Sequence, residues 1–100
     1  MSGADERDGI ERTDEASGGA YRVEVDGHMA EMTFSRAGEH MIIIDHTEVD
    51  DVLRGTGTGR QLVAAAVEWA RGADRRLLPL CPFARSVFDR VPEYRDVLAD

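Results

Sequence analysis

The chain has 100 residues and a mass of 11.0 kDa, the size of one small domain. Twenty acidic residues oppose twelve basic ones, all arginine, and the formal charge of -8 argues against a nucleic-acid or anionic-membrane partner. No apolar run approaches the ~20 residues of a membrane helix, and the N-terminus lacks the pattern of a secretory signal. We therefore expect a cytoplasmic protein. The single cysteine, Cys81, excludes an internal disulfide and a cysteine-based metal centre.

Residues 1–20 differ in composition from the rest of the chain. They carry six carboxylates and two arginines, and Ile10 is almost their only large apolar residue. Such a segment buries too little apolar surface to offset the entropy lost on ordering. We therefore expect a disordered acidic tail over residues 1–20 and one folded domain over residues 21–100.

Period-two alternation after residue 20 predicts three antiparallel strands. The first covers residues 21–25, and Asp26-Gly27 provides a two-residue hairpin turn into the second, at residues 28–35. The third strand, at about residues 40–50, is apolar on both faces over residues 41–44, which indicates a central position. Connections this short require antiparallel neighbours.

Two helices and a short strand are expected next. Apolar residues recur at helical spacing over residues 62–69, with Gly72 as the expected end of this helix. Residues 77–81 predict a strand parallel to the third one, because a helical crossover joins them. Pro79 and Pro82 limit pairing, so the sheet should open there, and Pro82 should begin the second helix. The predicted fold class is α/β (α+β), a mixed and mainly antiparallel sheet with two main helices.

Three glycines lie between the third strand and the first helix, at Gly55, Gly57 and Gly59. Free backbone N–H groups and the positive end of a helix dipole meet at such a place and attract a phosphate. The side chains that would add hydrogen-bond donors are Arg54, Thr56, Thr58 and Arg60. A tight connecting turn is the other interpretation. A Walker loop is excluded because it needs a lysine, and a dinucleotide fingerprint is excluded because Arg60 stands where it needs glycine.

Five motifs occur in order, namely Asp26-Gly27, His46-Thr47-Glu48-Val49, Arg54-Gly55-Thr56-Gly57, Cys81-Pro82-Phe83 and Pro92-Glu93-Tyr94. Together they resemble the GNAT superfamily of N-acetyltransferases, and its short single-domain YjdJ-like branch, over about residues 21–98. The resemblance implies acetyl-CoA as cosubstrate, an amine acceptor that is a small molecule or a protein, and no metal. Its implied cofactor-binding residues are Val49, Arg54, Gly55, Thr56, Gly57, Thr58, Gly59 and Arg60. The two acceptor-binding helices of larger members are missing, so the acceptor stays unidentified.

Acetyl transfer needs a base, because an amine with a pKa near ~10.4 is protonated at neutral pH. Glu48 is the first candidate, at a strand position where related enzymes often place a carboxylate. Its alternative role is a surface partner for an arginine. His46, on the same face, is a candidate base or relay, although a lone strand histidine is more often a partly buried polar residue.

Cys81 stands directly before the second helix, where it could protonate the CoA thiolate, accept the acetyl group or belong to the core. Tyr94 is a weaker candidate acid. The predicted function is N-acetylation by direct transfer from acetyl-CoA, with Glu48, Cys81 and His46 as candidate catalytic residues. The alternative is a non-catalytic CoA-binding or protein-interaction module that keeps the fold. Glu48 and Cys81 are expected to converge on one gap in the sheet.

Overall fold

The computed structural model describes residues 9–99, which form one five-stranded sheet with two main helices. The strands are β1 (Glu11–Asp14), β2 (Gly18–Val25), β3 (His28–Ala37), β4 (Met41–Val49) and β5 (Arg76–Pro79). The helices are α1 (Thr58–Ala73) and α2 (Pro82–Arg90), with short 3-10 helices η2 (Asp51–Leu53) and η3 (Pro92–Val97). The strand order is β1-β2-β3-β4-β5, antiparallel except for the parallel pair β4 and β5. The predicted fold class is confirmed.

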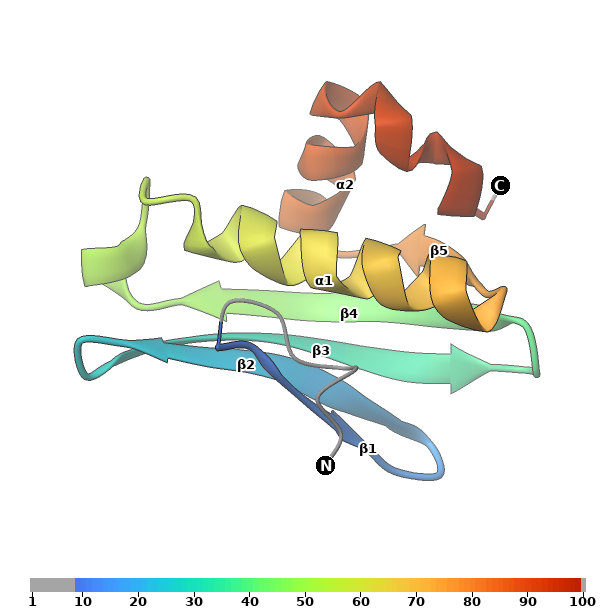
Figure 1. Cartoon of the computed structure of the whole chain (residues 1–100), viewed down its shortest axis with the longest axis horizontal. Helices are drawn as coiled ribbons and strands as arrows, with labels where there is room; N and C mark the ends of the chain where they lie inside the picture. The colour runs from blue at the N-terminus through green and yellow to red at the C-terminus, as the bar shows by residue number, and fades with distance from the viewer. Residues whose placement is uncertain (1–8, 100) are drawn as a thin grey trace.

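One face of the sheet is covered and the other is open. Helix α1 lies across the covered face, and α2 packs beside α1 and against the end of the sheet that carries β5 (Figure 1). Alternate strand residues such as Tyr21, Met32 and Ile44 are buried beneath α1, whereas Arg22 and Glu31 lie on the open face. No helix among residues 9–99 is long and apolar enough to cross a membrane.

The hairpin between β2 and β3 has the predicted two-residue turn. Val25 pairs with His28, and both turn residues take positive φ, at 52° for Asp26 and 81° for Gly27. Such a turn matches the twist of the strands on either side and leaves no room for an inserted helix. No helix is therefore inserted between β2 and β3.

A β-bulge interrupts the pairing of β3 with β4. Thr33 pairs with His46 but the next residue, Phe34, pairs with Ile44, so Asp45 is an extra residue in β4. The extra residue reverses the alternation of side chains along the rest of the strand. Ile44 points into the core, and both Asp45 and His46 are exposed on the open face. Ser35, on the open face of β3, donates a hydrogen bond to Asp45.

The expectation of a disordered tail is wrong for residues 9–20. Residues Glu11–Asp14 pair with β2 as an edge strand, and Ile10 has no exposed surface. The composition of residues 1–20 does not indicate this strand. A single apolar side chain, that of Ile10, is enough to anchor the segment, because the rest of the sheet provides a buried position for it. The rest of the predicted tail, residues 1–8, lies outside the described residues.

Arg12 attaches β1 to the covered face of the sheet. Its side chain is only 3% exposed, and its guanidinium carbon lies 4.1 Å from the ring centroid of Trp69 and 4.9 Å from that of Phe34. The guanidinium also donates to the Tyr21 hydroxyl at 3.0 Å and forms a 2.7 Å ion pair with Asp14. Stacking on aromatic faces and pairing with a carboxylate together offset the cost of burying this cation.

The ends of the two helices test two further predictions. Gly72 does not end α1, since the helix continues to Ala73 and closes at Asp74, whose φ of 57° is left-handed. Aspartate is one of the few residues besides glycine that adopts this conformation. Pro82 does occupy the first turn of α2, as predicted, because its missing N–H needs no partner there.

Replacing Ile10 tests whether residues 9–20 belong to the folded domain. Ile10→Ala is expected to lower the free energy of unfolding by about 2–5 kcal/mol, because it leaves a cavity in the core. The measurement is urea unfolding followed by circular dichroism. The control is Glu11→Ala, an exposed neighbour that should change stability by less than about 0.5 kcal/mol. Equal stability of the two variants would contradict the docking of this segment.

Candidate functional site

The glycine-rich segment forms a loop whose backbone conformation favours glycine at two positions. Gly55 has a φ of 80° and Gly57 a φ of 89°, both left-handed, while a Cβ at either position would meet no neighbouring atom. Glycine is therefore favoured here by the backbone conformation and not by a lack of space. Thr56 donates a hydrogen bond to the Leu53 carbonyl at 2.5 Å and contacts the Thr58 hydroxyl at 2.8 Å.

The two threonine hydroxyls are hydrogen-bonded within the loop. The single proton of the Thr56 hydroxyl is given to Leu53, so Thr58 must be the donor in the Thr56–Thr58 contact. Both protons are used within the loop, and Thr58 is buried. These hydrogen bonds hold the loop between Leu53 and the start of α1.

Helix α1 begins without a capping side chain among the described residues. The first helical hydrogen bond runs from Gln61 N–H to the Gly57 carbonyl at 3.0 Å. The N–H groups of Thr58, Gly59 and Arg60 therefore have no hydrogen-bond acceptor within the helix. Together with the positive end of the helix dipole, they make an anion-binding position.

A hollow of about 760 Å³ opens at this helix start, and we call it the loop hollow. Its lining residues are Thr47, Val49, Leu53, Arg54, Gly55, Thr56, Gly57, Gly59, Arg60, Phe83 and Arg90. Every cofactor residue implied by the sequence except Thr58 is in this set. Phe83 and Arg90, both on α2, were not among the expected residues, because only the packing of α2 beside α1 brings them here.

The loop hollow lies where β4 and β5 separate. Their pairing ends at Ile44 and Pro79, and the Ile44 carbonyl then accepts hydrogen bonds from both Leu80 and Cys81, each at 3.1 Å. The chain next turns into α2, so the last residues of β4 have no partner strand on that side. The predicted opening of the sheet at the prolines is present.

Cys81 lies in this opening. It is 4% exposed and precedes the first residue of α2, and its Sγ contacts the Thr47 hydroxyl at 3.3 Å. Thr47 lines the loop hollow, so Cys81 contacts a side chain that borders the hollow but does not line it itself. Tyr94 packs instead against the ring of Phe88, with centroids 5.9 Å apart, and does not line this hollow.

Glu48 and His46 lie on the open face of the sheet. Their side chains are 75% and 64% exposed, and His46 Nε2 is 3.2 Å from Glu48 Oε2. They border a second hollow of about 800 Å³, called here the sheet hollow. Glu31 lies directly across from Glu48 in the pairing of β3 with β4 and forms a 3.4 Å ion pair with Arg22.

The expected convergence of Glu48 and Cys81 on one gap is wrong. Cys81 contacts Thr47, whereas Glu48 follows Thr47 on the strand and therefore projects from the opposite face. The two hollows nevertheless share three lining residues, Thr47, Val49 and Arg54. The two hollows therefore adjoin at the end of β4.

The sheet hollow has an acidic rim. Four carboxylates line it, from Glu31, Glu48, Asp50 and Asp51, against the two arginines Arg22 and Arg54. A hydrogen bond from His28 at 3.0 Å lowers the pKa of Asp50 below its ordinary value, which keeps that carboxylate charged. Among residues 9–99, no three His, Cys, Asp or Glu side chains are grouped as metal ligands.

The comparisons with known proteins agree with this geometry. Residues 20–97 match the family described as GCN5-related N-acetyl-transferase. The fold also matches the NMR solution structure of a GCN5-like candidate N-acetyltransferase from Staphylococcus aureus, with a TM-score of 0.71 and 29% identity over 93% of this chain and 91% of that one. No match was found among curated proteins. The chain belongs to the GCN5-related N-acetyltransferase family.

The close contact between α1 and α2 at the loop hollow yields a stability prediction. A Cβ at Gly59 would lie 2.8 Å from Phe83 Cζ, so Gly59→Ala should cost about 1–3 kcal/mol of unfolding free energy through overpacking. Phe83→Leu, which removes the contacted ring atoms, should relieve most of that cost in the double variant.

Gly72→Ala is the matched control for this measurement by urea unfolding. Gly72 is also in α1, but a Cβ there meets nothing within 4 Å. The free energy of unfolding of this variant should rise by about 0.4–1 kcal/mol, because alanine reduces the entropy of the unfolded chain. A Gly59→Ala variant as stable as Gly72→Ala would show that the two helices are not packed as described.

Proposed function

We propose that this protein is an acetyl-CoA-dependent N-acetyltransferase that acts on an amine. The observation that carries the proposal is the uncapped start of α1, which opens into a hollow continuous with the separation of β4 from β5. The N–H groups of residues 58–60 would bind the diphosphate of CoA. Val49 and Phe83 would line the path of the pantetheine arm toward Thr47 and Cys81.

The acceptor amine would approach from the sheet hollow. Because Thr47, Val49 and Arg54 line both hollows, the thioester and the amine would meet where the two hollows adjoin, at the end of β4. The excess of carboxylates on this side favours an acceptor that arrives as an ammonium ion.

Glu48 is the residue proposed to take the proton. Its carboxylate removes the proton from the ammonium, and the neutral nitrogen then attacks the thioester carbonyl carbon. The C–S bond breaks as the C–N bond forms, and the CoA sulfur leaves as a thiolate that takes a proton. His46, 3.2 Å from Glu48, would hold the carboxylate in place or pass its proton to water.

Cys81 is proposed to act on the sulfur atom of CoA as it leaves. Its thiol and the Thr47 hydroxyl lie next to the loop hollow, on the opposite face of β4 from Glu48. That position suits protonation of the leaving thiolate. Direct transfer needs no acetyl-cysteine stage, since amine and thioester would lie side by side. A Cys81 adduct that forms with acetyl-CoA alone and then passes its acetyl group to amine would replace direct transfer by a two-step path.

The cosubstrate assignment is tested by thermal unfolding with and without CoA. The free energy of unfolding of the wild-type protein should rise by about 2.7 kcal/mol at a CoA concentration a hundredfold above Kd. Gly57→Glu should lose this gain, because a carboxylate at the helix start repels the diphosphate.

The control is Gly38→Glu, which puts the same side chain at another left-handed glycine, in the turn between β3 and β4. Both variants carry backbone strain, so the quantity compared is the ligand-induced gain and not the melting temperature itself. Gly38→Glu should keep the full gain. An absence of any gain in the wild type at millimolar CoA would refute the assignment.

The base assignment is tested by Glu48→Gln. This variant should bind CoA normally but acetylate an accepted amine about 10²- to 10⁴-fold more slowly, as measured by mass spectrometry of the product. The deficit should shrink as pH rises toward the pKa of the amine, because the neutral nucleophile becomes abundant.

Glu31→Gln removes the same charge from the same hollow and is the matched control. It should change the apparent amine affinity far more than the maximal rate. Equal losses of maximal rate in the two variants would argue against Glu48 as the base. Binding of CoA without turnover on any amine of a broad panel would favour the non-catalytic alternative.

A further inference from the structure

The lining of the loop hollow includes no acidic group that protonates a departing sulfur. Among the described residues, it has no histidine, carboxylate, lysine, tyrosine or cysteine. Its titratable groups are the guanidinium groups of Arg54, Arg60 and Arg90, which do not give up their protons in proteins. The thiolate that acetyl transfer would release there therefore needs a proton from a hydroxyl group or from water.

Among the described residues, two hydroxyl groups line the loop hollow, and they differ in what their protons do. The Thr56 hydroxyl donates its proton to the Leu53 carbonyl at 2.5 Å. The Thr47 hydroxyl instead accepts a hydrogen bond from Cys81 Sγ at 3.3 Å, so its own proton stays available to a ligand. Thr47 also lines the sheet hollow, so this hydroxyl lies where the two hollows adjoin.

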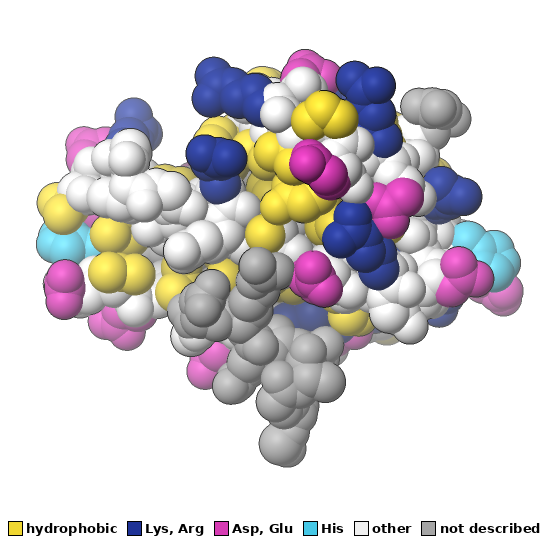
Figure 2. All heavy atoms as spheres, turned by 45° about the horizontal axis from the view of Figure 1, so that its top comes forward, with side chains coloured by type: hydrophobic (Ala, Val, Ile, Leu, Met, Phe, Trp, Pro, Cys, Tyr) yellow, Lys and Arg dark blue, Asp and Glu magenta, His cyan; other side chains and the backbone are white. Residues whose placement is uncertain are grey.

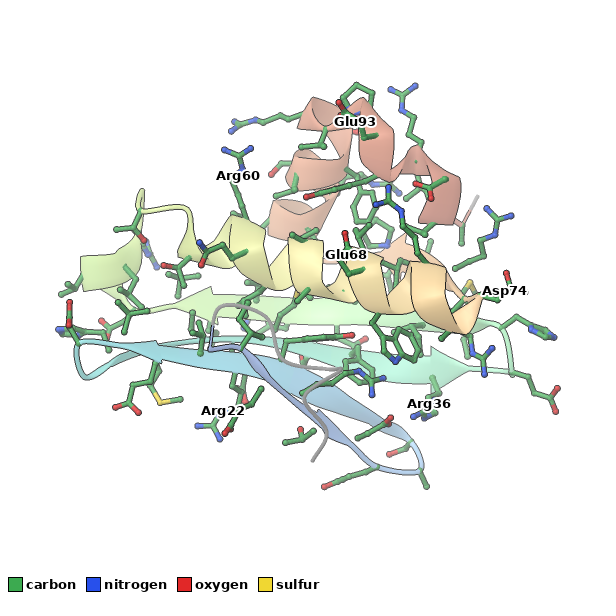
Figure 3. All side chains as sticks on the ribbon, viewed as in Figure 1. Arg22, Arg36, Arg60, Glu68, Asp74 and Glu93 are labelled. Atoms are coloured by element: carbon green, nitrogen blue, oxygen red, sulfur yellow. The ribbon has the colours of Figure 1, made fainter. Side chains whose placement is uncertain are left out.

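The candidate bases are on the other side of the sheet from the loop hollow. In Figure 3, Arg60, which lines the loop hollow, lies on the helix side of the sheet, and Arg22, which lines the sheet hollow, lies on the opposite side. His46 and Glu48 are exposed on the side of Arg22. On the face that carries the helices, the histidine side chains in view stand at the two ends, and apolar side chains gather near the middle (Figure 2). Thr47 is thus the hydroxyl through which a proton reaches the sulfur from within the protein.

Cys81 lies behind Thr47 as a source of that proton. A threonine hydroxyl is a far weaker acid than a thiol, so it gives up its proton only while it receives another. The Cys81 thiol is 4% exposed and hydrogen-bonded to Thr47, which places its proton on the Thr47 oxygen. Because Cys81 does not line the loop hollow, its proton reaches a ligand there through Thr47. Donor and acceptor are both alkyl thiols, so the transfer is nearly balanced in free energy.

We propose that the Thr47 hydroxyl protonates the departing sulfur of CoA and takes its replacement proton from Cys81, which makes the pair a proton relay. The inference rests on the proposed function, because it assumes that acetyl-CoA occupies the loop hollow. The electron pair of the broken C–S bond stays on sulfur, which takes the Thr47 proton as the Thr47 oxygen takes the Cys81 proton. CoA leaves as a thiol, and the Cys81 thiolate then regains a proton from water through Thr47. Thr47 is the catalytic acid, and Cys81 is not acetylated.

The experiment uses hydroxylamine as the nucleophile, because it is largely uncharged at neutral pH and needs no base. Its conversion of acetyl-CoA to acetohydroxamate, corrected for the rate without protein, therefore reports on the departure of the sulfur. Thr47→Val keeps the shape of the side chain and should lower the maximal rate about 10²-fold, the low end for acid catalysis, since a thiolate is already a good leaving group. Binding of CoA in calorimetry should stay near that of wild type. Thr47→Ser should restore most of the rate.

A double-mutant cycle tests the part played by Cys81. Cys81→Ala should also slow the reaction, and Thr47→Val/Cys81→Ala should be no slower than Thr47→Val, because both groups act on one proton path. The matched control is Thr33→Val. Thr33 also contacts β4 through its hydroxyl, which donates to the His46 carbonyl at 3.4 Å, but it lines neither hollow. This control should react at the wild-type rate.

The outcomes separate the relay from the proposed function. A wild-type rate in Thr47→Val, or a Thr47→Ser variant as slow as Thr47→Val, would overturn the relay. A double variant whose loss is the product of the two single losses would do the same, because the two groups would then act independently. A loss confined to the KM for hydroxylamine would also overturn it, since that marks a role in binding the nucleophile.

The wild-type protein distinguishes the remaining cases. Protein that binds CoA but does not speed the cleavage of acetyl-CoA would overturn the relay and favour the non-catalytic alternative. Protein that does not bind CoA would refute the proposed function itself.

Discussion

The carbonyl oxygen of Ile44 is the point on which the candidate site depends. It accepts hydrogen bonds from two successive residues, Leu80 and Cys81, and there the parallel pairing of β4 with β5 ends. Neither Pro79 nor Pro82 has an N–H with which to continue the ladder. The end of β4 is consequently left without a neighbour on that side, and the loop hollow occupies the space between it, α1 and α2.

A single extra residue in β4 decides which side chains face which hollow. Without the bulge at Asp45, strict alternation would place Glu48 on the same face as Ile44, beneath α1. With it, Thr47 and Val49 face the loop hollow and Glu48 faces the open side of the sheet. The two hollows adjoin at the end of this strand, where the proposed function has the thioester meet the amine.

The N-terminal strand shows a related dependence on partners distant in the chain. Arg12 is stable in its buried position because Phe34, Trp69 and Asp14 surround it with aromatic faces and a carboxylate. Burial would raise the pKa of Asp14, but hydrogen bonds from Arg12 and Arg36 outweigh that effect and lower it. Edge strand and core therefore stabilise one another.

The sequence by itself determined the features that depend on residues adjacent in the chain. The Asp26-Gly27 hairpin, the start of α2 at Pro82 and the glycine-rich loop before α1 follow from local conformational preferences, and these in turn predicted the fold class. The family motifs also indicated seven of the eleven residues that line the loop hollow.

Only the tertiary structure decided the bulge, the docking of β1 and the presence of Arg90 at the loop hollow. Each of these depends on pairing or packing between segments far apart in the chain. Strand register is set by the partner strand, and the burial of Ile10 or Arg12 is set by residues that come later in the sequence. Local patterns carry no information about such contacts, because the free energy that favours them appears only when both partners are in place.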